Sequence, residues 1–166
     1  MKHAIIAGTG IYDIPTVELK EKIVETRYGD ALVLMGQGEH DDLIFLPRHG
    51  VSHDQPPHKI NYRANIKALA DLGVKRVIAN YAVGGIAPHI EPLSLTTLAD
   101  ILDFTHGRPF TFFDGAPDQV KHVEMSHPYC PIMSQKIIKL APSHGLKIHK
   151  NATYVATNGP RFETPA

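Results

Sequence analysis

The sequence of 166 residues contains one cysteine, no tryptophan and no excess of charge, since 17 Lys and Arg balance 17 Asp and Glu. With Cys130 alone, no disulfide can form within the chain, which excludes a disulfide-stabilised scaffold and favours a reducing compartment. Balanced charge without a dense Lys or Arg run removes the attraction that drives nucleic-acid binding. We therefore expect a cytoplasmic protein that binds neither DNA nor RNA.

Long apolar runs are also missing. No stretch approaches the roughly 20 apolar residues that a membrane helix needs, and Lys2 and His3 lead directly into a short apolar run without a signal-peptide pattern. A chain of this size hides roughly two-thirds of its unfolded surface, so it needs no metal or disulfide to build a core. Glycine and proline are spread along the chain without repeats, which predicts a single domain over residues 1–166.

Apolar runs and helical spacing predict an alternation of strands and helices. Strands are expected over residues 3–7, 31–35, 43–46, 74–83, 93–104 and 152–157. A helix is expected between Asn61, a suitable N-cap, and Gly73, a suitable stop. A second helix should run from Met133 until Pro142, because proline lacks the donor that a helix requires. This alternation predicts an α/β domain with a parallel or mixed sheet.

Four short motifs directly follow apolar runs. They are Gly8-Thr9-Gly10, Arg48-His49-Gly50, Ala82-Val83-Gly84-Gly85 and Gly159-Pro160-Arg161-Phe162. Ligands of α/β sheets gather beyond the carboxyl ends of the strands, so these four ends can contribute to one pocket.

The first two motifs suit an oxyanion. Gly8-Thr9-Gly10 offers unshielded backbone N–H groups and a hydroxyl, although a tight turn would use the same residues. Arg48 supplies a fork of donors that matches phosphate, and His49 adds another. The alternative for Arg48 is an ordinary ion pair with a nearby carboxylate.

The last two motifs have structural alternatives as well. The small residues from Ala82 to Gly85 can expose amides to an anion, or they can form a tight packing corner. Phe162, directly beyond a strand, can stack on a planar ligand or pack in the core.

The sequence gives less support to two other kinds of site, a dinucleotide site and a metal site. Dinucleotide binding, which would indicate a nicotinamide-dependent oxidoreductase, needs a third glycine where Asp13 stands. His49, His53 and His58 invite a metal site, but the prolines before His58 argue against a helix presenting them together, and no nearby carboxylate completes a ligand set. We expect neither a metal nor an organic cofactor.

Taken together, the motifs resemble those of a known enzyme family. Three further motifs accompany the four strand-end motifs: Asn61-Tyr62-Arg63-Ala64-Asn65-Ile66, Phe113-Asp114-Gly115 and Pro128-Tyr129-Cys130-Pro131. The order and spacing of all seven match those of the family. This set resembles the methylthioadenosine/methylthioinosine phosphorylase branch of the purine nucleoside phosphorylase family over essentially the whole chain. The resemblance implies a phosphorylase/hydrolase-like three-layer α/β fold with a mixed, partly barrel-like sheet, usually in a homotrimer.

The resemblance also implies a reaction. Members cleave a purine nucleoside, such as S-methyl-5'-thioinosine or S-methyl-5'-thioadenosine, with inorganic phosphate to give free purine and (5-methylthio)ribose 1-phosphate. Carried over residue by residue, it implies that phosphate is bound by Thr9, Arg48, His49 and the amide of Ala82. It further implies roles for Phe162 against the purine or sugar, for His122 in a neighbouring subunit's sugar pocket and for Glu163 in specificity.

Three departures from the family pattern modify this expectation. Tyr81 stands where the branch often has a threonine that touches phosphate, so we assign Tyr81 no ligand role. Asn158 replaces a frequent glutamate, which favours methylthioinosine or a broader range of purines. The resemblance places the purine-protonating acid beyond Ala166, so we expect a domain that is incomplete at its C-terminal end. The alternative is a catalytically weak short homologue that binds phosphate or nucleoside.

Overall fold

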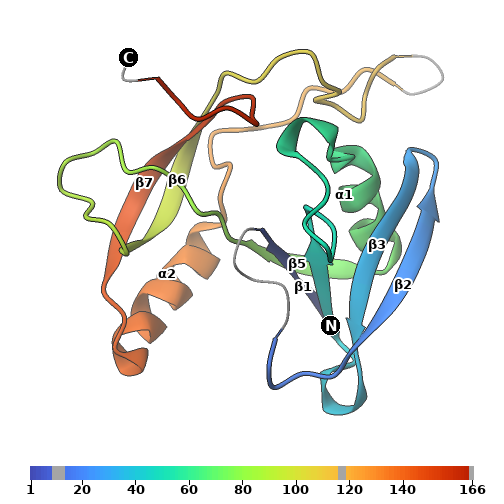
Figure 1. The fold of residues 1–166 in the computed structure, drawn as a ribbon, viewed down its shortest axis with the longest axis horizontal. Helices are drawn as coiled ribbons and strands as arrows, with labels where there is room; N and C mark the ends of the chain where they lie inside the picture. Colours follow the sequence, from blue (N-terminus) through green and yellow to red (C-terminus); the bar gives the residue numbers. More distant parts are fainter. Residues whose placement is uncertain (9–13, 116–118, 165–166) are drawn as a thin grey trace. The chain divides into compact units, whose positions relative to one another are not determined.

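The computed structural model describes residues 1–8, 14–115 and 119–164 (Figure 1). The chain divides into two compact units. Unit 1 comprises Met1–Val83 and Pro109–Phe112, and unit 2 comprises Gly84–Arg108 and Phe113–Ala166. The single domain over residues 1–166 stays a prediction.

Unit 1 is built on a five-stranded sheet in the order β2-β3-β4-β1-β5. Its strands are β1 (Lys2–Ala7), β2 (Leu19–Thr26), β3 (Gly29–Gly36), β4 (Leu43–Pro47) and β5 (Val74–Ala79). β1 is parallel to both β4 and β5, whereas β3 is antiparallel to β2 and β4. The expected mixed sheet is therefore confirmed, and the carboxyl ends of three neighbouring parallel strands meet at one edge.

The core of unit 1 explains why these runs become strands. Ile44, Phe45 and Leu46 of β4 are at most 1% exposed, because β4 lies inside the sheet between β3 and β1. Fully burying side chains of this size stabilises a fold by about 1.5–3 kcal/mol each. The strands expected at residues 3–7, 31–35 and 43–46 are confirmed as β1, β3 and β4.

Helix α1 (Tyr62–Asp71) packs on this sheet as a short amphipathic helix (Figure 1). The side chain of Asn61 accepts a hydrogen bond from the backbone N–H of Ala64 at 3.1 Å, which confirms Asn61 as the N-cap. Ala64 and Ala68 are fully buried against Ala31 of β3. These small side chains let the helix approach the sheet closely.

The barrel-like closure is not present in the residues that the structure describes. A barrel requires its first and last strands to pair. Here the outermost strands are β2, next to β3, and β5, next to β1, so the sheet of unit 1 is open. Helix α1 supplies one helical layer, and the three-layer arrangement stays a prediction.

Unit 2 contains a two-stranded parallel sheet of β6 (Leu95–Asp103) and β7 (Ile148–Ala156). Helix α2 (Pro131–Leu140) contacts β6. As expected, α2 ends before Pro142, which lies in a 3-10 turn over Ala141–His144. Two further 3-10 turns, Gly38–His40 and Pro57–Lys59, belong to unit 1.

Two strand predictions extended too far. The strand expected over residues 74–83 ends at Ala79, because Ala79 pairs with Ile6 and the partner strand β1 itself ends at Ala7. The strand expected from residue 93 begins at Leu95, because Leu93 has a φ of 64°, which a strand does not accommodate.

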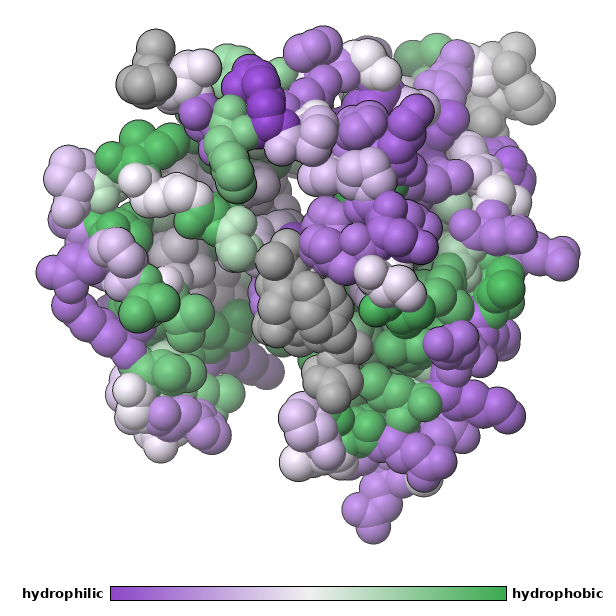
Figure 2. All heavy atoms as spheres, in the orientation of Figure 1, coloured by the Kyte–Doolittle hydropathy of each residue, from purple (hydrophilic) through white to green (hydrophobic). Residues whose placement is uncertain are grey.

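Neither α-helix in the described part of the chain has the length and apolar character that crossing a membrane requires. Unit 2 does expose large apolar side chains, and Figure 2 shows apolar surface on this unit. They include Leu93, Leu95, Leu102, Phe104, Ile132 and Leu140.

Candidate anion site at the ends of three parallel strands

The candidate site of unit 1 lies where β4, β1 and β5 end side by side. Hydrogen bonding between the strands continues one residue past β4 and β5. The N–H of Arg48 donates to the carbonyl of Ala7, and the N–H of Asn80 donates to that of Ile6, both at 3.0 Å. The order β4-β1-β5 therefore brings Arg48, Gly8 and Asn80 to adjacent positions. This is the edge at which α/β sheets bind ligands.

The guanidinium of Arg48 is held from several sides at this edge. Its Nη1 donates to the carbonyl oxygen of Asn80 at 2.6 Å, and its Cζ lies 5.1 Å from the centre of the Tyr81 ring. A Cβ at Gly8 would overlap the guanidinium, so a larger residue there would force Arg48 to move. Because a guanidinium is planar, a bond to one nitrogen and a ring beside it fix its orientation.

His49 follows Arg48 and is 9% exposed. Its Nδ1 lies 2.9 Å from the carbonyl oxygen of Gln55, while the N–H of Gln55 donates to the carbonyl of His49 at 3.0 Å. A carbonyl oxygen only accepts, so Nδ1 carries the hydrogen of this bond. In the neutral ring, Nε2 is then an acceptor.

The pKa of His49 is lowered from its ordinary value. Burial is the largest cause, because it disfavours the charged ring. The bond to Gln55 opposes this shift, whereas the positive charge of Arg48 and the ring of His53 reinforce it. The lowered pKa favours the neutral ring of His49 at pH 7.

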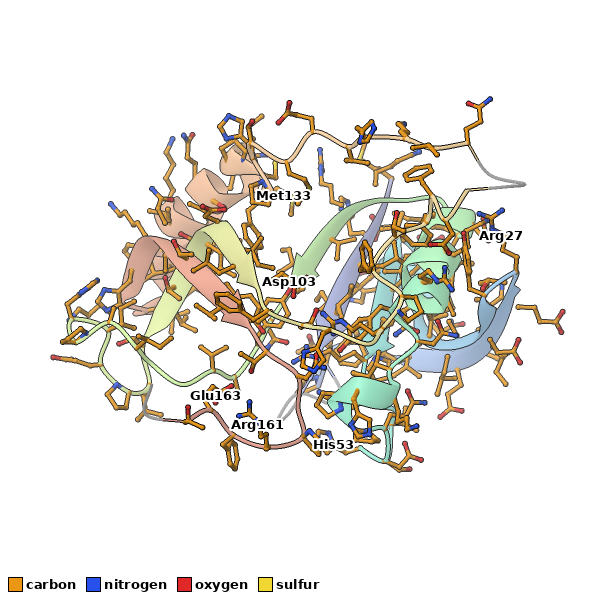
Figure 3. The ribbon with its side chains drawn as sticks, turned by 90° about the horizontal axis from the view of Figure 1, so that it is seen from above. Arg27, His53, Asp103, Met133, Arg161 and Glu163 are labelled. Carbon is orange, nitrogen blue, oxygen red and sulfur yellow. The ribbon has the colours of Figure 1, made fainter. Side chains whose placement is uncertain are left out.

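His53 lies in the loop after β4 (Figure 3), with its ring centre 4.8 Å from that of His49. His58 lies in the 3-10 turn over Pro57–Lys59. Across residues 1–8, 14–115 and 119–164, no three His, Cys, Asp or Glu side chains gather closely enough to hold a metal ion.

The remaining predicted phosphate ligands are Ala82 and Thr9. Ala82 lies on exposed chain directly after Tyr81 and within unit 1. Thr9 lies outside the described residues. The structure thus brings Arg48 and His49 to the same strand edge as the segment that leads to Ala82, and their phosphate role stays a prediction.

Unit 2 holds the other predicted residues. The segment after β7 borders a cavity of about 520 Å³. Its lining comprises Phe104, His106, Thr157, Asn158, Gly159, Pro160 and Arg161. The side-chain amide of Asn158 donates to the carbonyl of His106 at 2.8 Å and accepts from its N–H at 3.3 Å. Asn158 therefore ties the segment after β7 to the segment after β6.

The specificity candidate Glu163 accepts a hydrogen bond from the hydroxyl of Thr157 at 3.3 Å. Glu163 and Arg161 lie on the same segment after β7 (Figure 3). Phe162, between them, is 90% exposed, which leaves its ring available to a ligand. His122 is exposed in the irregular connection between β6 and α2.

Sequence reasoning missed two features of the strand edge. Tyr81 and the carbonyl of Asn80 both hold Arg48, and Gln55 fixes the ring of His49. The expected strand over residues 74–83 contained Tyr81, so no sequence signal showed that Tyr81 lies beyond the end of β5 beside Arg48. No local sequence pattern identifies Gln55 as a partner of His49, because the bond to His49 is made by the backbone carbonyl of Gln55 and not by its side chain.

Comparison with known proteins agrees with the motif resemblance. The chain matches the model of the phosphorylase superfamily over residues 2–166. It is 46% identical to the 6-oxopurine nucleoside phosphorylase of Pyrococcus furiosus, over 98% of this chain and 63% of that protein. It is 43% identical to the probable S-methyl-5'-thioinosine phosphorylase of Methanopyrus kandleri, over 98% and 62% respectively.

A solved structure gives the same result. Methylthioadenosine phosphorylase from Schistosoma mansoni in complex with adenine has a TM-score of 0.89 at 31% identity, covering 98% of this chain and 67% of that one. The chain belongs to the phosphorylase superfamily, and the resemblance is confirmed. It spans a little under two thirds of the length of the two curated relatives named above.

Proposed function

We propose that the protein is a purine nucleoside phosphorylase that uses inorganic phosphate as co-substrate and needs no cofactor. In this reaction a phosphate oxygen forms a bond to the anomeric carbon as the C–N glycosidic bond breaks. The purine leaves with the bonding electrons and takes up a proton. The products are free purine and ribose 1-phosphate, or its 5-methylthio derivative. A positioned anion and a stabilised leaving group are what such a site must supply.

The arrangement around Arg48 is the single observation that carries this proposal. A forked cation at the carboxyl ends of parallel strands, held by the Asn80 carbonyl, is suited to bind phosphate through paired hydrogen bonds. In the proposed site, Arg48, His49 and the amide of Ala82 bind phosphate together with Thr9. A purine nucleoside lies against Phe162, and Glu163 contributes to the choice of substrate.

The proposed assembly is a homotrimer in which His122 contributes to a neighbouring subunit's sugar pocket. His122 is exposed and outside the helices and strands of unit 2, which leaves it accessible to a second chain.

The proposed substrates are nucleosides of 6-oxopurines, including inosine and S-methyl-5'-thioinosine, ahead of S-methyl-5'-thioadenosine. Two observations support this order. Asn158 stands where the methylthioadenosine branch often has glutamate, and the relatives with 46% and 43% identity carry names of 6-oxopurine and methylthioinosine enzymes. The order is tested by comparing kcat/KM for the three nucleosides.

The decisive experiment measures phosphate-dependent purine release by the natural protein at its own length. We expect hypoxanthine and ribose 1-phosphate from inosine only when phosphate is present. Arg48→Ala should reduce kcat/KM for phosphate by about tenfold or more, as expected when a charge-assisted contact is lost. Arg76→Ala, on exposed β5, is the matched control and should leave the rate unchanged.

Two results would contradict the proposed function. Purine release that does not depend on phosphate would indicate a hydrolase. Phosphate or nucleoside binding without measurable turnover would favour the alternative of a catalytically weak binding homologue.

A further inference from the structure

Tyr81 is placed to act on Arg48. It follows Asn80 at the end of β5, and its ring centre lies 5.1 Å from the Cζ of Arg48. This separation is within the range in which a guanidinium is attracted by the electron-rich face of an aromatic ring. Tyr81 is 39% exposed, so solvent reaches the ring from one side while Arg48 lies against it.

We propose that Tyr81 is a positioning residue that sets the phosphate affinity of the site by holding the guanidinium of Arg48 in its binding orientation. This inference rests on the proposed function, because phosphate is the anion that Arg48 would bind. It assigns the effect to the ring of Tyr81. The ring does the positioning through its contact with the guanidinium.

Arg48 is preorganised for a ligand by these contacts. A free arginine side chain has several rotatable bonds, and ordering it when a ligand arrives costs conformational entropy. In this structure two consecutive residues hold it: Asn80 accepts a bond from Nη1 at 2.6 Å, and Tyr81 offers its ring. Part of the ordering cost is thereby met before phosphate binds.

The guanidinium of Arg48 lies between Gly8 on one side and Asn80 and Tyr81 on the other. The space beside the guanidinium is filled on the β1 side by the backbone of Gly8, where a Cβ would overlap Arg48. The carbonyl of Asn80 and the ring of Tyr81 come from the β5 side. Arg48 is thus held between the ends of two strands, and loss of the ring would loosen one of these contacts.

The test compares the binding of inorganic phosphate by calorimetry in the natural protein, in Tyr81→Leu and in Tyr81→Phe. Tyr81→Leu keeps an apolar side chain of moderate size but removes the ring, and should weaken phosphate about two- to fivefold. Tyr81→Phe keeps the ring and should bind phosphate as the natural protein does. The KM for nucleoside should stay unchanged in both variants.

A second comparison shows whether the effect passes through Arg48. When Arg48 is already replaced by Ala, adding Tyr81→Leu should weaken phosphate no further, since the group that the ring holds is gone. Thermal unfolding of each variant checks that the fold is intact. If Tyr81→Leu fails to fold, Tyr81→Met, which also lacks a ring, replaces it.

Three results would overturn the inference: unchanged phosphate affinity in the ring-less variant, an equal loss in Tyr81→Phe, or an undiminished effect of Tyr81→Leu in the Arg48→Ala background. If the natural protein itself does not bind phosphate, the proposed phosphate site fails, and this is seen before any variant is measured. If the natural protein binds phosphate and its affinity does not change in the Tyr81 variants, only the positioning role of Tyr81 is refuted.

Discussion

The guanidinium of Arg48 occupies the space that a side chain on Gly8 would need. Gly8 directly follows β1, and Arg48 directly follows the parallel neighbour β4. Because Gly8 has no side chain, the guanidinium of Arg48 can lie across the end of β1. This pairing gives a structural reason for a glycine directly after the first strand.

Replacing Gly8 by alanine should displace Arg48. We expect Gly8→Ala to weaken phosphate binding by about tenfold or more, the effect of losing a hydrogen bond to a charged group. Calorimetry with inorganic phosphate measures this loss. Gly8→Ala combined with Arg48→Ala should be no worse than Arg48→Ala alone. If Gly8→Ala binds phosphate as tightly as the natural protein, the position of the guanidinium beside Gly8 is not required for phosphate binding.

The orientation of His49 predicts a preference among anions. Since Nδ1 is bonded to the Gln55 carbonyl, only Nε2 is left for an anion, and in the neutral ring it accepts a hydrogen bond. Phosphate retains a proton at neutral pH and can donate it to Nε2, whereas sulfate has none. We therefore expect phosphate to bind at least several-fold more tightly than sulfate at pH 7.5.

Acid should reduce this preference. The pKa of His49 lies below its ordinary value of 6.5, so the ring becomes charged only as the pH falls further below 6.5, and Nε2 then donates to either anion. Competition calorimetry at pH 7.5 and 5.5 measures the ratio of the two affinities. His58→Asn, an exposed position, is the control and should keep the trend. A ratio near one at both pH values would argue against an accepting Nε2.

Asn61 should contribute to stability through both ends of its amide. Its Oδ1 caps α1 by accepting from the N–H of Ala64 at 3.1 Å, and its Nδ2 donates to the carbonyl of Tyr28 at 2.6 Å. Loss of a cap costs about 1 kcal/mol, and loss of one further hydrogen bond costs about as much. We expect Asn61→Ala to lower the free energy of unfolding by about 2 kcal/mol.

Urea denaturation of three proteins separates these two contributions. Asn61→Asp keeps the capping oxygen but replaces the donor that faces Tyr28, so its stability should fall between those of Asn61→Ala and the natural protein. Equal stability of all three proteins would mean that α1 does not depend on this cap.

The sequence predicted the inner strands of unit 1 better than its edges. β4 is an apolar run because both faces of it are buried, and such runs are visible without a structure. β2 was missed, because Lys20, Glu21 and Lys22 are exposed and give it no apolar run. Charged residues are common on edge strands, where they discourage pairing with other chains.

The candidate site was predictable only where its chemistry is carried by motifs. Arg48 and His49 were identified because donors directly after a strand suggest an anion site. For His49 the structure differs, because its donor nitrogen is bonded to Gln55 and the other nitrogen of the neutral ring accepts. The support of Arg48 by Tyr81 depends on the pairing of Ile6 with Ala79, which sets where β5 ends relative to β1. Such register is a property of the folded sheet and has no local sequence signal.

Arg48 is proposed to bind phosphate and to leave the nucleoside to other residues. This is tested by introducing Arg48→Ala into the natural protein at its own length and measuring its affinity for inorganic phosphate and for a purine nucleoside. We expect a loss of about tenfold or more for phosphate and little change for the nucleoside. Equal losses for both ligands would contradict it.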